Sequence, residues 1–275
     1  MTIETNRDPQ SQRPDSVELI GPEFDSQSST PADRTLIICA APRTGSYELC
    51  RYLLAAGIGV PHEYFLFENA RVLAKRWAIA DHPLREPQLG RYIEELRRRR
   101  AQNGVFAAKL QYDQFERALR NRHGAALFDG ACVVHLFRPD VAAQYASYRT
   151  AITRGVWDFS PRRTTKPVIR DPANFDKFFA DALTEARWIV DTDAGFRGLF
   201  ILLGIRPLFV TTDELFSEPH RVIRRIAEAT GTAVDEDALQ RAIACSAAYG
   251  RDGEGESAFS GLTERFRKIA FPEPR

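Results

Sequence analysis

The fold is indicated by residues 36–46, LIICAAPRTGS, where an apolar run leads directly into a short polar turn. Consecutive apolar residues such as 36–40 are typical of a strand buried on both faces of a parallel sheet. The turn at 42–46 holds a glycine, small hydroxyls and one cation, and a helical pattern follows it. Such a turn offers backbone N–H groups and the positive end of a helix dipole to an anion.

This turn is not a Walker A loop, because the GxxxxGK[ST] spacing and its lysine are absent. Their absence counts against an ATPase or a nucleoside kinase. The alternative interpretation is an ordinary capped turn between a strand and a helix.

Three further apolar runs predict strands at residues 104–110, 131–137 and 206–211. Helical patterns alternate with them at about 66–102, 140–154, 174–203 and 219–230. This alternation predicts an α/β fold with a mostly parallel central sheet flanked by helices. Ligands of such sheets bind beyond the carboxyl ends of the strands.

Composition fits one such domain. The chain has 275 residues, 44% hydrophobic and 27% charged, enough for a substantial core. We expect a flexible extension at residues 1–33, which are rich in proline and polar residues, and a single domain over 34–275. Lys and Arg number 38 against 37 Asp and Glu, so the overall charge does not suggest a nucleic-acid or membrane-surface binder.

Targeting and metal-binding patterns are missing. No apolar run approaches the roughly 18 residues of a membrane helix, and the N-terminus lacks a signal-peptide pattern, so we expect a cytoplasmic protein. Neither CxxC spacing nor a histidine pair at i, i+4 occurs, so no metal is expected. The cationic run 97–100 ends an amphipathic helix without aromatic interleaving, so we do not interpret it as a nucleic-acid site.

Several segments together resemble the PAPS-dependent sulfotransferases, most closely the mycobacterial trehalose 2-sulfotransferase family. In chain order they are PRTGS at 42–46, PHEYF at 61–65, GVFAAKL at 104–110, HLFRPDV at 135–141 with Gln144 and Ser147, VW at 156–157 and ERFR at 264–267. The resemblance implies a P-loop-like three-layer architecture. It also implies transfer of a sulfuryl group from 3′-phosphoadenosine 5′-phosphosulfate (PAPS) to a hydroxyl of a sugar-like acceptor.

The resemblance also implies where the donor binds. The 5′-phosphosulfate is expected at Arg43, Thr44, Gly45, Ser46 and Tyr47. The 3′-phosphate is expected at Arg138 and Ser147, where a guanidinium can form a bidentate pair. Taken without the resemblance, a strand-end arginine is more often part of a surface salt bridge. The family usually has a threonine at the position of Tyr47, so one hydroxyl contact departs from its pattern.

Two residues are candidates for catalysis. Glu63 falls on the family's proposed catalytic glutamate and is our candidate general base, with a solvated loop carboxylate as the alternative. Lys109 carries a compact charge suited to the leaving phosphate, with a salt bridge to a helix as the alternative. Eukaryotic cytosolic relatives carry Lys-x-His here, with the histidine as base. Gln111 stands at that third position and cannot take a proton at neutral pH, which strengthens Glu63.

The acceptor is expected to contact His62, Gln111 and Trp157, since an indole stacks on the apolar face of a sugar. The resemblance further implies that the donor binds without a metal. It also implies a homodimer, but no feature of the sequence indicates the dimer surface. Two other functions stay open: a P-loop-type nucleotide kinase, and a non-catalytic nucleotide- or glycan-binding protein.

Overall fold

A computed structural model describes residues 18–26, 30–79, 82–154 and 175–248. Its strands are β1 (Arg34–Ala40), β2 (Ala101–Gln102), β3 (Val105–Leu110), β4 (Cys132–Phe137) and β5 (Leu208–Thr211). They form one sheet in the order β2-β3-β1-β4-β5, and every neighbouring pair is parallel except β2 and β3. The predicted mostly parallel sheet is confirmed.

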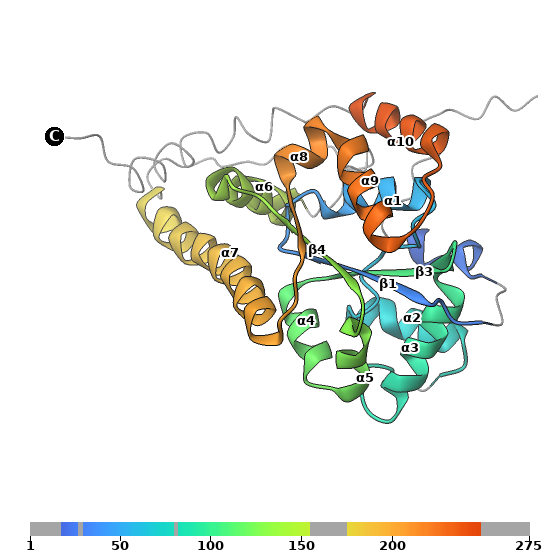
Figure 1. Ribbon diagram of the computed structural model, residues 1–275. Coiled ribbons are helices and arrows are strands. Elements are labelled where there is room, and N and C mark those ends of the chain that lie inside the picture. The colour runs from blue at the N-terminus through green and yellow to red at the C-terminus, as the bar shows by residue number, and fades with distance from the viewer. Residues whose placement is uncertain (1–17, 27–29, 80–81, 155–174, 249–275) are drawn as a thin grey trace, which may run out of the picture.

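Helices cover both faces of this sheet (Figure 1). Their bounds are α1 (Ser46–Ala55), α2 (Phe67–Arg76), α3 (Gln88–Arg99), α4 (Tyr112–Leu119), α5 (Arg122–Ala125), α6 (Val141–Arg154), α7 (Phe175–Leu203), α8 (Thr212–Ser217), α9 (Pro219–Thr230) and α10 (Glu236–Ala248). Helices α1, α9 and α10 lie on one face, and α2 to α5 lie on the other. The result is the three-layer α/β architecture that was expected.

Alternate side chains of β1 enter two separate hydrophobic cores. Leu36 and Ile38 face the core built with α1 and α9, whereas Ile37 and Cys39 face the core built with α2, α3 and α4. All four are fully buried. Because both faces of the strand are covered, β1 has to be apolar at successive positions rather than at every second one.

The predicted elements differ from the observed ones mainly at their ends. The helical pattern at 66–102 divides into α2 and α3 around the proline-rich stretch 77–87, and its last residues form β2 instead. Four further helices, α4, α5, α8 and α10, were not predicted. In α10 only Leu239 is fully buried among the described side chains, so its apolar stripe is too narrow to stand out in the sequence.

Part of the N-terminal segment is packed, which corrects the expectation of flexibility for residues 18–26. Leu19 and Ile20 are buried against the domain. The fully buried guanidinium of Arg100 donates to the carbonyl oxygens of both, at 2.9 Å each, and pairs with Asp25 at 2.9 Å. A single arginine thus supplies polar contacts that the composition of this segment does not reveal.

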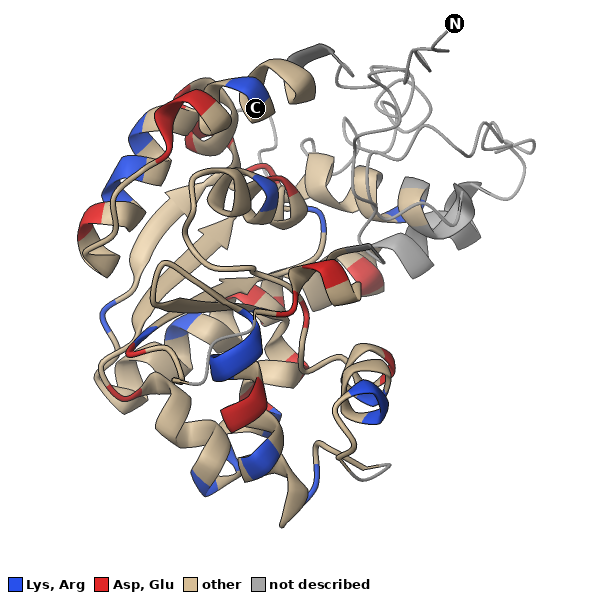
Figure 2. Ribbon diagram, turned by 90° about the vertical axis from the view of Figure 1, so that its right-hand side faces the viewer, with Lys and Arg blue, Asp and Glu red and all other residues tan. Residues whose placement is uncertain are grey.

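Charged residues of both signs are distributed over the fold. Figure 2 shows Lys and Arg interspersed with Asp and Glu over the described helices. In the described ranges, no helix combines the length and the apolarity that crossing a membrane requires.

Candidate active site

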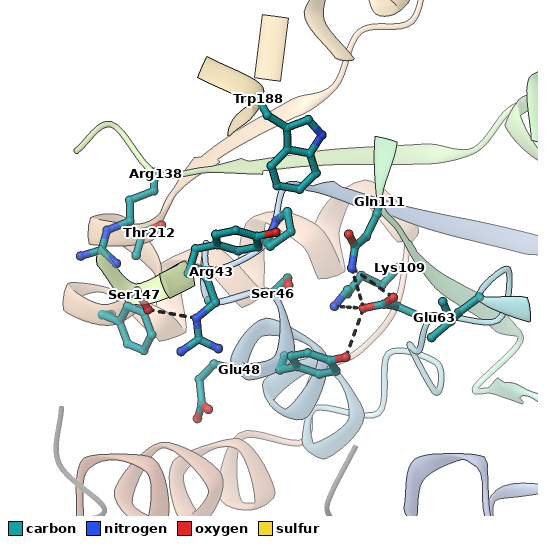
Figure 3. A pocket seen from close by; sticks show the side chains of 16 residues that line it. Arg43, Ser46, Glu48, Glu63, Lys109, Gln111, Arg138, Ser147, Trp188 and Thr212 are labelled. Carbon is teal, nitrogen blue, oxygen red and sulfur yellow. Dashed lines mark hydrogen bonds and ion pairs between the residues drawn. The ribbon is translucent and has the colours of Figure 1, made fainter. Parts of the chain in front are cut away.

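A cavity of about 420 Å³ opens where β1, β3 and β4 end (Figure 3). Its lining comes from the segments after these strands, from the segment between α1 and α2, and from α1, α6, α7 and α8: Pro42, Arg43, Gly45, Ser46, Tyr47, Glu48, Glu63, Leu66, Lys109, Gln111, Arg138, Ser147, Tyr148, Trp188, Thr212 and Phe216. Most of the residues proposed from the sequence therefore meet in one place, at the carboxyl edge of the sheet, as expected for this type of fold.

The 42–46 turn leads into α1 through two residues in the left-handed region. Arg43 has a φ of +66° and Gly45 a φ of +85°. A Cβ at Gly45 would lie 3.0 Å from the ring of Phe216, so both the backbone conformation and the space favour glycine. None of the described side chains caps α1. The N–H groups of its first turn are therefore left to water or to a ligand.

Cationic and hydroxyl groups gather at this end of the cavity. The Nε of Arg43 donates to the Oγ of Ser147 at 2.9 Å, which ties the turn to α6. Gln144 adds a second tie by donating to the carbonyl of Pro42 at 2.7 Å. Arg138, directly after β4, lines the same end (Figure 3). Two guanidinium groups beside a helix N-terminus make this end suited to a polyanion.

Glu63 and Lys109 lie at the other end of the cavity, brought together by backbone pairing. The chain turns at Gly59, which has a φ of +72° and passes so close to β3 that a Cβ there would lie 2.7 Å from that strand. His62 then forms a parallel bridge with β3, and the N–H of Lys109 donates to the carbonyl of His62 at 3.0 Å. This places Glu63 in an ion pair with Lys109.

The Glu63 carboxylate also accepts several hydrogen bonds. Its donors are the Nε2 of Gln111 at 3.3 Å, the Nε2 of Gln114 at 3.2 Å and the hydroxyl of Tyr47 at 3.2 Å. The Lys109 ammonium lies 3.6 Å from the centre of the Tyr47 ring. Side chains of α1 and α4 therefore enclose the ion pair, and each charge also stabilises the other.

These contacts shift the pKa of both ions. Burial acts to raise the pKa of Glu63, but the Lys109 charge and the hydrogen bonds outweigh it and lower that pKa to about 2. Burial likewise acts to lower the pKa of Lys109, and the Glu63 charge raises it. Both groups are thus charged at neutral pH. Glu63 is a weak base while Lys109 stays beside it. A ligand that draws the Lys109 ammonium away would raise the pKa of Glu63.

Three of the proposed residues are placed differently from what the sequence suggested. The Thr44 side chain is buried, and its hydroxyl donates to the carbonyl of Ala41 at 3.0 Å instead of lining the cavity. His62 is buried against Tyr64, outside the cavity lining, and burial lowers its pKa to about 4. The hydroxyl of Tyr47 donates to Glu63. Trp157 lies outside the described residues.

The structure adds residues that the sequence analysis did not propose. Gln114 reaches Glu63 from a capping box formed with Gln111, and the Q-x-x-Q spacing is a signal that could have indicated it. Trp188 and Phe216 enter the cavity lining from α7 and α8, far along the chain. No local pattern distinguishes these two from core aromatic residues.

An anion-binding turn after the first strand of a parallel sheet, in one cavity with a buried carboxylate and a lysine, is typical of group-transfer enzymes with a P-loop-like fold. Comparison with family models narrows this class, since residues 35–248 match the model described as Stf0 sulphotransferase. The chain belongs to the Stf0 sulfotransferase family, the trehalose 2-sulfotransferase type, and is therefore a sulfotransferase. A search of curated proteins finds no match.

Membership of this family implies a small-molecule acceptor. Every residue that lines the cavity falls within the matched span. Within the described part of the chain, no group of three His, Cys, Asp or Glu side chains is placed to hold a metal ion.

Proposed function

We propose that this enzyme transfers the sulfuryl group of PAPS to a hydroxyl of a carbohydrate-like acceptor and releases adenosine 3′,5′-bisphosphate. One observation carries the proposal: the two ends of a single cavity offer different chemistry. Cations and a helix N-terminus line one end, and the Glu63–Lys109 pair lines the other.

Two anion-binding places are needed for PAPS, one for the 5′-phosphosulfate and one for the 3′-phosphate. In our proposal the 42–46 turn and the N-terminus of α1 bind the 5′ group, while Arg138 and Ser147 bind the 3′ group. The 2.9 Å contact between Arg43 and Ser147 supports this, because the residues proposed for the two groups lie close together, as the 3′ and 5′ positions of one ribose require. Trp188 offers an aromatic face in the same cavity for the adenine ring.

The chemical step is an in-line displacement at sulfur. The acceptor oxygen forms a new bond to sulfur, and the bond from sulfur to the bridging oxygen breaks, so that its electron pair leaves with the phosphate. Glu63 takes the acceptor's proton as general base. The Lys109 ammonium stabilises the negative charge that develops on the leaving phosphate.

Donor binding also prepares the base. Lys109 lines the cavity, and the phosphosulfate competes with Glu63 for its ammonium. Once Lys109 turns to the donor, the pKa of Glu63 rises toward its ordinary range, because the largest interaction that lowers it is weakened. A carboxylate with a higher pKa is the better proton acceptor.

The acceptor contacts are the least defined part of the proposal. Gln111 lines the cavity beside Glu63 and is placed to bind an acceptor hydroxyl. Trp157 stays a prediction, as do the homodimer and the cytoplasmic location. The burial of His62 favours an indirect role for it, through the backbone pairing that fixes its neighbour Glu63.

Radiolabelled PAPS, incubated with the enzyme and a panel of sugars and glycolipids, tests the proposal. We expect labelled acceptor and bisphosphate in equal amounts. Transfer from γ-labelled ATP in place of PAPS would favour the kinase, and bisphosphate binding without transfer to any acceptor would favour a binding protein. Activity should persist in EDTA, because Arg43, Lys109 and Arg138 meet the donor's charges. A loss restored by Mg²⁺ would contradict this account of the donor site.

A further inference from the structure

Tyr47 contacts both members of the buried ion pair. Its hydroxyl donates to Glu63 at 3.2 Å, and the Lys109 ammonium lies over its ring at 3.6 Å from the centre. A cation is attracted to the face of an aromatic ring, and more strongly where water is excluded. The Lys109 side chain is only 3% exposed. The tyrosine is therefore in contact with the base and with the cation at once, through two different parts of its side chain.

The phenol remains a hydrogen-bond donor at neutral pH. The Lys109 charge acts to lower the pKa of Tyr47, but burial and the Glu63 charge outweigh it, and the pKa of Tyr47 is raised. The hydroxyl is therefore protonated and directed to an ionised carboxylate, a charge-assisted contact. The hydroxyl that sequence comparison placed on the phosphosulfate is thus used by Glu63.

Position along the chain gives Tyr47 a further property. It is the second residue of α1, directly after Ser46, so its backbone belongs to the helix N-terminus that faces the donor. Gln111 and Gln114 hold the same carboxylate, but from α4. Tyr47 consequently links the proposed base to the donor-binding turn by a single residue.

We propose that Tyr47 is a positioning residue that couples the donor turn to the base. Its ring holds the Lys109 ammonium between Glu63 and the donor, and its hydroxyl orients the Glu63 carboxylate toward the acceptor. This inference rests on the proposed roles of Glu63 and Lys109. It assigns to Tyr47 a function different from that of a donor ligand.

Two variants separate the hydroxyl from the ring. Tyr47→Phe keeps the ring, and we expect kcat to fall about tenfold while the donor KM stays within about twofold, since misplaced catalytic groups cost rate rather than donor affinity. Tyr47→Leu also removes the cation–ring contact, and kcat should fall about a hundredfold. Tyr52→Phe is the matched control, a buried tyrosine on the same helix outside the cavity lining, and should match the wild type.

A double-mutant cycle with Glu63→Gln shows whether Tyr47 acts through Glu63. Tyr47→Phe should then have no further effect on kcat in the Glu63→Gln background, because the carboxylate that it orients is absent. An equal loss in both backgrounds would overturn the proposal. So would a raised donor KM with unchanged kcat, which would make the hydroxyl a donor ligand.

Two controls keep the outcomes distinct. The rise in melting temperature with adenosine 3′,5′-bisphosphate reports folding and the donor site in every variant. A fully active Glu63→Gln enzyme would overturn the proposed base, and this inference with it. An inactive Glu63→Gln enzyme together with a fully active Tyr47→Phe enzyme would overturn this inference alone.

Discussion

Lys109 and Glu63 form an ion pair in which each side chain is only 3% exposed to solvent. Removing two charges from water is costly, and loss of one partner leaves the other as an uncompensated buried charge. In our proposal the pair links catalysis to stability, because the two groups proposed for proton transfer and leaving-group stabilisation also support the local fold.

We expect Glu63→Gln to lower kcat by about 10²- to 10⁴-fold, as is typical for loss of a general base, without weakening PAPS binding. The amide keeps the size of the carboxylate but cannot accept the proton. Steady-state kinetics with PAPS, or single-turnover assays with the radiolabelled donor, measure the effect. Glu116→Gln, an ion-paired carboxylate on α4 well exposed to solvent, is the control. Turnover within about threefold of the wild type would remove Glu63 from the role.

The ion pair should also make stability depend on pH. The pKa of Glu63 is lowered from 4.5 to about 2 in the folded state, so its ionised form stabilises the fold. This contribution is fully present above about pH 4.5 and is lost as the pH falls toward about 2. Glu63→Gln should cost about 3–5 kcal/mol of unfolding free energy at neutral pH.

Urea unfolding of both proteins over a range of pH measures this dependence. The difference in unfolding free energy between wild type and Glu63→Gln should narrow as the pH falls from about 4.5 to about 2. Adding Lys109→Met to Glu63→Gln removes the buried charge that the single variant leaves unpaired, so the double variant should be the more stable of the two. A difference that does not change with pH would contradict the lowered pKa.

Donor recognition predicts a ranking of ligands. Adenosine 3′,5′-bisphosphate at 100 times its Kd should add about 2.7 kcal/mol of stability, measured as a rise in melting temperature. Adenosine 5′-phosphosulfate should add less, because it lacks the 3′-phosphate and forfeits a charge-assisted contact of about 1.5–3 kcal/mol with Arg138. Arg138→Ala should abolish the difference between the two ligands, and Arg117→Ala, an exposed position on α4, should preserve it. Equal shifts from both ligands on the wild type, or from ATP, would contradict the PAPS assignment.

Arg100 should be essential for the packed part of the N-terminal segment. Arg100→Met removes the donor to the carbonyls of residues 19–21 and the buried cation that pairs with Asp25, and we expect a loss of about 3–5 kcal/mol in urea unfolding. Arg98→Met, which removes a partly exposed ion pair with Glu95 on the same helix, should cost less than about 1 kcal/mol. Equal losses in the two variants would show that the buried contacts contribute no more than a surface pair.

Some properties of the protein could be predicted from the sequence alone. The apolar stretch 36–40 and the turn after it indicated a buried parallel strand and an anion site, because burial on both faces leaves no polar alternation. Similar runs located β3, β4 and β5. Resemblance to a known family pointed to Glu63, Lys109 and the donor residues, which local pattern could not have distinguished from surface ion pairs.

Other properties were decided by the tertiary structure. Glu63 meets Lys109 because the chain after Gly59 pairs with β3, and Tyr47 meets both because α1 begins beside them. The roles of Tyr47 and Thr44, which the sequence assigned to the donor, depended on which neighbour each hydroxyl reaches. Sequence periodicity reports which face of an element is buried, whereas hydrogen bonds and ion pairs depend on the partners that distant segments bring within reach.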